Sequence, residues 1–168
     1  FHAIMEKMTA SAIDYLNYQI DEGVQAIQIF DSWVGCLSVS DYRNHVFAHS
    51  KKLLDSISGK VPVIHFGTGN PSLLPLMNEA GGDVMALDWR APLKESWELL
   101  GCKAVQGNMD PIALFGSVDS VRQAAGLILE EVGGRPGHIF NLGHGILPET
   151  PVENVKALVE FVQGYQIS

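Results

Sequence analysis

A histidine between two glycines, Gly143-His144-Gly145, closes the apolar segment 137–143, and its setting points to chemistry. Glycine lets a backbone turn sharply or approach a ligand closely. The imidazole can donate or accept a hydrogen bond and titrates near neutral pH. We therefore expect the ring of His144 to point into a binding pocket.

Polar or glycine-rich tips also follow the other apolar segments of the chain. The residues at the five tips, in order, are Asp31, Ser32 and Trp33; His65, Thr68 and Asn70; Asp88, Trp89 and Arg90; Gln106, Asn108 and Asp110; and Asn141 and His144. In parallel α/β sheets the carboxyl ends of the strands form the functional edge. The pattern therefore predicts a site there.

Most of these residues also have a structural explanation when taken singly. We expect Asp110 to cap the helix that Pro111 opens, His65 to be a packed histidine, Asn108 and Asn141 to tie strand ends together, and Ser32 alone to be an ordinary loop hydroxyl. Asp88 is equally well explained as a cap or partner of Arg90 and as a site residue.

The sequence offers little for a metal or a nucleotide cofactor. His45 and His49 have the i, i+4 spacing of metal ligands but lack an acidic third ligand, so a solvated helix face is favoured. The segment HFGTGNP lacks the dinucleotide fingerprint, and Cys36 and Cys102 form no CxxC motif. We expect neither metal nor cofactor.

Short apolar segments alternate with amphipathic ones along the chain. Strands are predicted at 24–30, 61–67, 83–89, 103–108 and 137–143, and helices at 4–21, 40–57, 70–80, 92–100, 117–132 and from Thr150 on, where Thr150 and Glu153 form a capping box. This alternation predicts an α/β fold with a parallel sheet. A five-stranded flavodoxin-like sheet and five units of a (β/α)8 TIM barrel both fit.

Composition restricts the function classes. The 168 residues, 46% hydrophobic, suffice for one domain, and eleven basic against nineteen acidic residues give a net charge of −8. No basic stripe predicts nucleic-acid binding, and no apolar run is long enough to span a membrane. Two unpaired cysteines favour a reduced, cytoplasmic protein. An anionic ligand would need a few local donors, because the overall charge opposes it.

Four motifs, FDSWVG (30–35), ALDWR (86–90), QGNMDP (106–111) and FNLGHGILPETPVENV (140–155), together resemble the carboxyl-terminal half of the uroporphyrinogen decarboxylase family. The resemblance implies that residues 1–168 are part of a single (β/α)8 barrel domain and supply about its last five βα units. It implies that Ser32 and His144 contact the substrate and that Phe30 helps to wall the cleft. The family's catalytic aspartate, paired arginines and tyrosine lie in the other half, so no catalytic residue is assigned here.

The implied activity is that of a cofactor-free carboxy-lyase, which converts the four acetates of uroporphyrinogen to methyl groups, giving coproporphyrinogen for heme synthesis. The family resemblance also implies a homodimer, and we expect these 168 residues alone to be inactive. Two alternatives remain. One is a zinc- and cobamide-linked methyltransferase of the same barrel superfamily, although Phe66 and Gly67 stand where a thiolate ligand is needed. The other is a non-catalytic flavodoxin-like binding module.

Overall fold

The computed structural model describes residues 1–166 and contains a five-stranded, wholly parallel sheet. The spatial order of the strands is the order of the chain, β1-β2-β3-β4-β5. Their bounds are β1 Ile27–Asp31, β2 Val63–Gly67, β3 Val84–Ala86, β4 Ala104–Gln106 and β5 His138–Ile139. Each strand is shorter than the predicted apolar segment, because the flanking residues belong to the loops.

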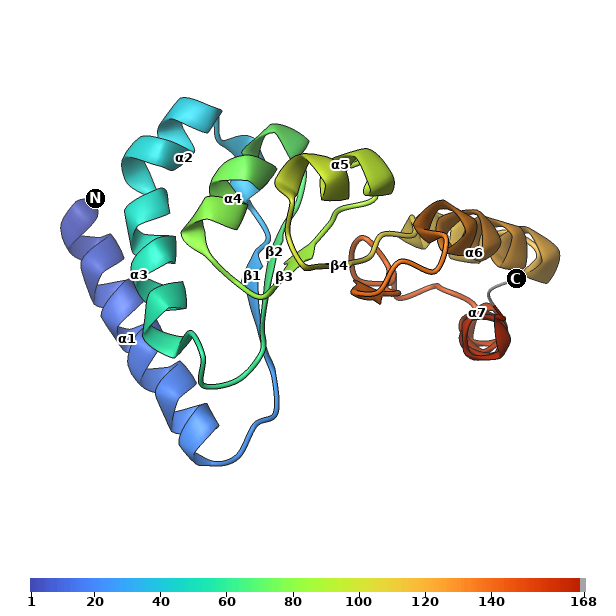
Figure 1. The fold of residues 1–168 in the computed structure, drawn as a ribbon, viewed down its shortest axis with the longest axis horizontal. Helices are drawn as coiled ribbons and strands as arrows, with labels where there is room; N and C mark the ends of the chain where they lie inside the picture. The colour runs from blue at the N-terminus through green and yellow to red at the C-terminus, as the bar shows by residue number, and fades with distance from the viewer. Residues whose placement is uncertain (167–168) are drawn as a thin grey trace.

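Helices connect the strands and pack against one another in chain order, α1 on α3, α3 on α4, α4 on α5, α5 on α6 and α6 on α7. Figure 1 shows them following one another around the sheet from the blue to the red end of the chain. The α-helices are α1 His2–Asp21, α2 Val39–His45, α3 Phe47–Ile57, α4 Leu74–Ala80, α5 Leu93–Leu100, α6 Val118–Val132 and α7 Val152–Gly164. Short 3₁₀ turns are η1 Val34–Cys36, η2 Pro71–Leu73 and η3 Pro111–Phe115.

The strand order decides between the two predicted architectures. A flavodoxin-like sheet reverses its order at a switch point, whereas sequential right-handed crossovers place every helix on one face. The Gln106 side chain on β4 lies 3.4 Å from that of Gln28 on β1. In a flat sheet β1 and β4 would be separated by three strand spacings of about 4.8 Å each, too far for these side chains to meet at this distance. The sheet is therefore curved, as in an arc of a (β/α)8 barrel, and the flavodoxin-like alternative is wrong.

The core lies between the strands and the helices, in three adjoining apolar clusters. One joins α1 and α3 to β1 and β2, a second joins α2, α4 and α5 to β3 and β4, and a third lies between α6, α7 and η3. Trp97 anchors the middle cluster: it is buried, and its indole N–H donates to the carbonyl of Cys102 at 2.9 Å. Within residues 1–166 no helix has both the length and the apolar character needed to cross a bilayer.

Two of the predicted helices differ from the structure, one in its continuity and one in its N-terminal cap. The predicted helix 40–57 is two helices separated at Val46, whose φ of −119° departs from the helical value, and Ser38 caps the first by accepting from the N–H of Asp41 at 3.1 Å. At α7 the capping box is absent. The N-cap position belongs to Pro151, while the Thr150 hydroxyl is buried without a hydrogen-bond partner among the described residues.

Candidate functional site

Two adjoining clefts lie at the carboxyl edge of the sheet, where the polar tips meet. The larger, which we call the tip cleft, has a volume of about 570 Å³ and is lined by Ser32, Trp33, Gly35, Cys36, Thr68, Gly69, Trp89, Arg90 and His144. The smaller, the barrel cleft, has a volume of about 220 Å³ and is lined by Gln28, Phe30, Phe66, Ala86, Leu87, Gln106, Asn141, Leu142, His144 and Gly145. His144 belongs to both.

His144 is exposed, and its imidazole lies between two aromatic rings. The ring centroids are 6.4 Å from Phe66 and 6.1 Å from Trp89, the latter edge-on at 81°. Gly143 allows this placement, because a Cβ at that position would lie 2.3 Å from the backbone N of Trp89. A Cβ on Gly145 would meet nothing within 4 Å. The glycine before His144 therefore serves close packing against the tip of β3, whereas the one after it meets no such constraint.

Ser32 and Phe30 reach the two clefts from β1. Ser32 follows the last residue of the strand and lines the tip cleft, where Gly35 lets its loop touch the next tip: a Cβ there would lie 2.2 Å from the Thr68 carbonyl oxygen. Phe30 pairs in register with Phe66, with their rings 5.9 Å apart, and remains 66% exposed toward the barrel cleft. The three predicted site residues thus line two clefts that share His144.

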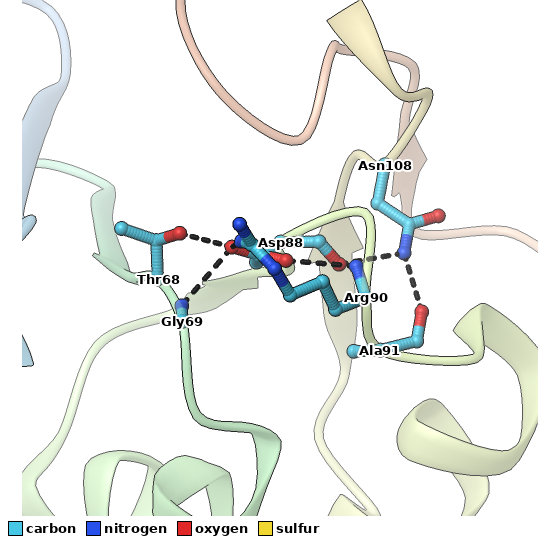
Figure 2. A network of polar contacts seen from close by, with 6 residues as sticks. All are labelled: Thr68, Gly69, Asp88, Arg90, Ala91 and Asn108. Atoms are coloured by element: carbon cyan, nitrogen blue, oxygen red, sulfur yellow. Dashed lines mark hydrogen bonds and ion pairs between the residues drawn. The ribbon is translucent and has the colours of Figure 1, made fainter. Parts of the chain in front are cut away.

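Asp88 is the centre of a polar network (Figure 2) that includes Thr68, Gly69 and Arg90 from the lining of the tip cleft. Its carboxylate is almost fully buried, and it accepts four hydrogen bonds. The donors are the Thr68 hydroxyl, the Gly69 N–H at 3.0 Å, the Arg90 N–H at 2.7 Å and the Arg90 guanidinium at 2.6 Å. The network holds the tips of β2 and β3 together, and Asp88 is the ion-pair partner of Arg90 but caps no helix, since the N-cap of α5 is Pro92.

Asn108 holds the same turn from the other side. Its buried amide donates to the carbonyls of Asp88 at 3.0 Å and Ala91 at 2.6 Å (Figure 2). This confirms its predicted role in tying strand ends. Trp89 and Arg90 stand between Asp88 and Ala91 in the chain. Trp89 lines the tip cleft, and Arg90 stacks on its indole, with the guanidinium carbon 3.7 Å from the ring centroid.

Comparison with known proteins shows which family this chain belongs to. The family model described as uroporphyrinogen decarboxylase (URO-D) matches residues 1–165. The chain belongs to the uroporphyrinogen decarboxylase family. Curated proteins of that name from Koribacter versatilis and Thermus thermophilus are each 50% identical to it, over 96% and 97% of this chain. These matches cover 47% and 48% of the relatives, so the chain spans about half the length of the curated relatives it matches.

Among solved structures, a methyltransferase from Methanosarcina mazei superposes with a TM-score of 0.78 at 27% identity, covering 92% of this chain and 46% of that one. The likeness supports the partial barrel and shows that this chain shares its fold with part of at least one methyltransferase. As with the curated relatives, the match takes in about half of the larger chain.

Two predicted tip residues, His65 and Asp110, make the structural contacts that the sequence predicts, and a third, Asn141, does not. His65 is fully buried and faces the helices, with Nδ1 3.2 Å from the carbonyls of Met77 and Gly81, and burial lowers its pKa. Asp110 caps η3 by accepting from the N–H of Ile112 at 2.9 Å, as predicted. Asn141 departs from prediction: its side chain is exposed at the barrel cleft and makes no hydrogen bond within residues 1–166.

The prediction that His45 and His49 lie on one solvated helix face is wrong for His49. The break at Val46 puts His45 and His49 on different helices, and His49 is buried against α1, with Nδ1 3.5 Å from the Thr9 hydroxyl. No group of three side chains in the described part of the chain is arranged to hold a metal ion.

Asp31 and Phe66 have surroundings that no local motif indicated. Asp31 lines a third cavity, formed by α1, α3 and β1, which shares Phe30 with the barrel cleft. Burial raises the pKa of the Asp31 carboxyl to about 6. Phe66 lines the barrel cleft beside Phe30, and only the interstrand register places it there.

Proposed function

We propose that this chain forms the carboxyl-terminal half of a barrel that decarboxylates uroporphyrinogen to coproporphyrinogen, removing carbon dioxide from each of four acetate side chains. The observation that carries the proposal is the convergence of Ser32, from the FDSWVG motif, and His144, from NLGHG, on one cleft. These residues come from opposite ends of the described sheet. Membership of the family supports the reaction.

In this proposal the chain binds and orients the substrate. Phe30, Phe66 and Trp89 give the joined clefts apolar walls suited to a macrocycle of pyrrole rings, and the Ser32 hydroxyl and the His144 imidazole donate to carboxylates at its rim. Each acetate loses its carboxyl group as carbon dioxide after a pyrrole ring carbon is protonated, and the electron pair of the broken C–C bond neutralises the ring cation. A second proton then converts the exocyclic methylene carbon to a methyl group, and the ring carbon gives up its added proton to restore the pyrrole. The apolar walls exclude water from the charged intermediate and strengthen its electrostatic stabilisation.

His144→Ala in the full-length protein tests this assignment. Removing one hydrogen bond to a carboxylate should raise the KM for uroporphyrinogen about tenfold and change kcat less. The assay is chromatographic separation of the oxidised porphyrin products. His45→Ala is the matched control, because His45 is also exposed and lines neither cleft. An unchanged KM in His144→Ala would refute the assignment.

A methyltransferase function is the alternative that the Methanosarcina mazei neighbour raises. A zinc-activated thiol would need a histidine and cysteines at a strand end, yet the ring of His65 faces the helices and Gly67 follows two residues later. Cys36 is exposed in the tip cleft, and Cys102 lies outside both clefts. Stoichiometric zinc in the purified full-length protein, with no conversion of uroporphyrinogen, would favour the methyltransferase.

We also propose that the full-length protein is a homodimer in the cytoplasm. The family resemblance supports the dimer, and two free thiols suit a reducing compartment. Sedimentation equilibrium of the purified full-length protein tests the dimer, and fractionation of the source cells tests the compartment.

A further inference from the structure

An anionic ligand faces an electrostatic difficulty on this chain. The net charge is −8, so a polycarboxylate must be met by local cations. Among the described residues that line the tip and barrel clefts, Arg90 is the one that carries a full positive charge, and none carries a negative charge.

The structure holds Arg90 in place before any ligand arrives. Its guanidinium is bonded to the buried carboxylate of Asp88 at 2.6 Å and stacked on the indole of Trp89 at 3.7 Å. A planar guanidinium fixed in this way loses little side-chain freedom on binding a carboxylate. Figure 2 shows the Arg90 side chain lying across Asp88.

Donors remain free on Arg90 after these contacts are made. The guanidinium has five N–H groups, and Asp88 accepts from Nη1, while 49% of the side chain is exposed. Asp88 already accepts from the Thr68 hydroxyl and from two backbone N–H groups, so its own charge is well satisfied. The free edge of Arg90 can therefore take a second, incoming carboxylate.

We propose that Arg90 binds a peripheral carboxylate of the substrate in the tip cleft, on a wall shared with His144, and that Asp88 is its positioning residue. Trp89 is that wall, since it contacts both the guanidinium and the imidazole. Together with Ser32 and His144, Arg90 then gives the cleft donors from three strand tips. This inference rests on the proposed decarboxylase function and names a further contact at the same site.

The test compares Arg90→Gln, Arg90→Lys and Arg122→Gln in the full-length protein, with uroporphyrinogen as substrate at low and high potassium chloride. Arg122 is the matched control: its side chain is 47% exposed, near Asp119, and lines neither cleft. We expect Arg90→Gln to raise KM about tenfold with a smaller change in kcat. We also expect it to flatten the rise of KM with salt, because one charged contact is lost.

The outcomes separate the role of Arg90 from the proposed function. A variant that only folds less well has a lower maximal rate, but its KM and the salt dependence of KM are those of the wild type. If Arg90→Gln shows wild-type values of KM and of its salt dependence, Arg90 does not bind the substrate and the inference is overturned. If Arg90→Gln does not fold, Arg90→Lys carries the test, since it keeps the charge but not the planar fork; KM should rise roughly threefold. A wild-type KM in Arg90→Lys would then overturn the inference. No conversion by the wild type would overturn the proposed function as well.

Discussion

Asn108→Ala probes the turn that carries Trp89 and Arg90. The buried amide of Asn108 donates two hydrogen bonds, to the carbonyls of Asp88 and Ala91. Alanine removes both donors and leaves space that water cannot readily reach. The turn between the two carbonyls would lose its anchor to the tip of β4.

The expected cost follows from the two bonds. Each neutral hydrogen bond contributes about 1 kcal/mol net, and a buried carbonyl left without its donor costs more. The backbone carbonyl of Asp88 still accepts a hydrogen bond from the N–H of Ala91 at 3.0 Å. The free-energy cost of a buried carbonyl without a donor therefore comes mainly from the carbonyl of Ala91. We therefore expect the free energy of unfolding to drop by about 2–3 kcal/mol.

Asn154→Ala is a matched control. Asn154 is also buried, and its amide donates to two carbonyls, Leu114 at 2.7 Å and Gly116 at 2.9 Å, but it lines neither cleft. Urea denaturation of the full-length variants should give similar losses of stability. Only Asn108→Ala should also lower kcat/KM for uroporphyrinogen, by about tenfold, because small displacements of binding groups are costly. Equal kcat/KM in the two variants would refute the reasoning.

Three further predictions concern the glycine before His144, the carboxyl of Asp31 and the isolated chain. Gly143→Ala should cost about 1–3 kcal/mol of unfolding free energy through its clash with the backbone of Trp89, whereas Gly145→Ala should be near neutral; equal urea midpoints would contradict this. Burial raises the pKa of Asp31 to about 6, so the folded state binds a proton more tightly than the unfolded chain, and stability should fall as pH rises from about 4 to about 6. Asp31→Asn should remove that part of the pH dependence, gaining about 1–2 kcal/mol at pH 7 after allowance for its partial exposure, and an unchanged urea profile against pH would count against it. The isolated 168-residue chain should not decarboxylate uroporphyrinogen, because β1 and β5 leave open sheet edges; turnover by that chain would show the expectation to be wrong.

Local signals in the sequence were enough to place the strands, most helices and the polar tips. Hydrophobic periodicity and caps such as Ser117, which accepts from the N–H of Ser120, depend on a few neighbouring residues and can be read directly. The same locality explains the failures. Thr150 had every feature of a cap, yet its hydroxyl is buried without a hydrogen-bond partner among the described residues and α7 has Pro151 at its N-cap, so the local motif did not decide the helix start.

The sequence by itself determined that a parallel α/β sheet would carry Ser32 and His144 at its carboxyl edge, and the four motifs identified the family. The tertiary structure alone decided that the sheet curves in sequential order, that Phe66 faces Phe30, and that Arg90 lies on Trp89 beside His144. The reason is physical. Strand periodicity and capping act within a few residues, whereas these contacts depend on the register and curvature that bring distant segments together.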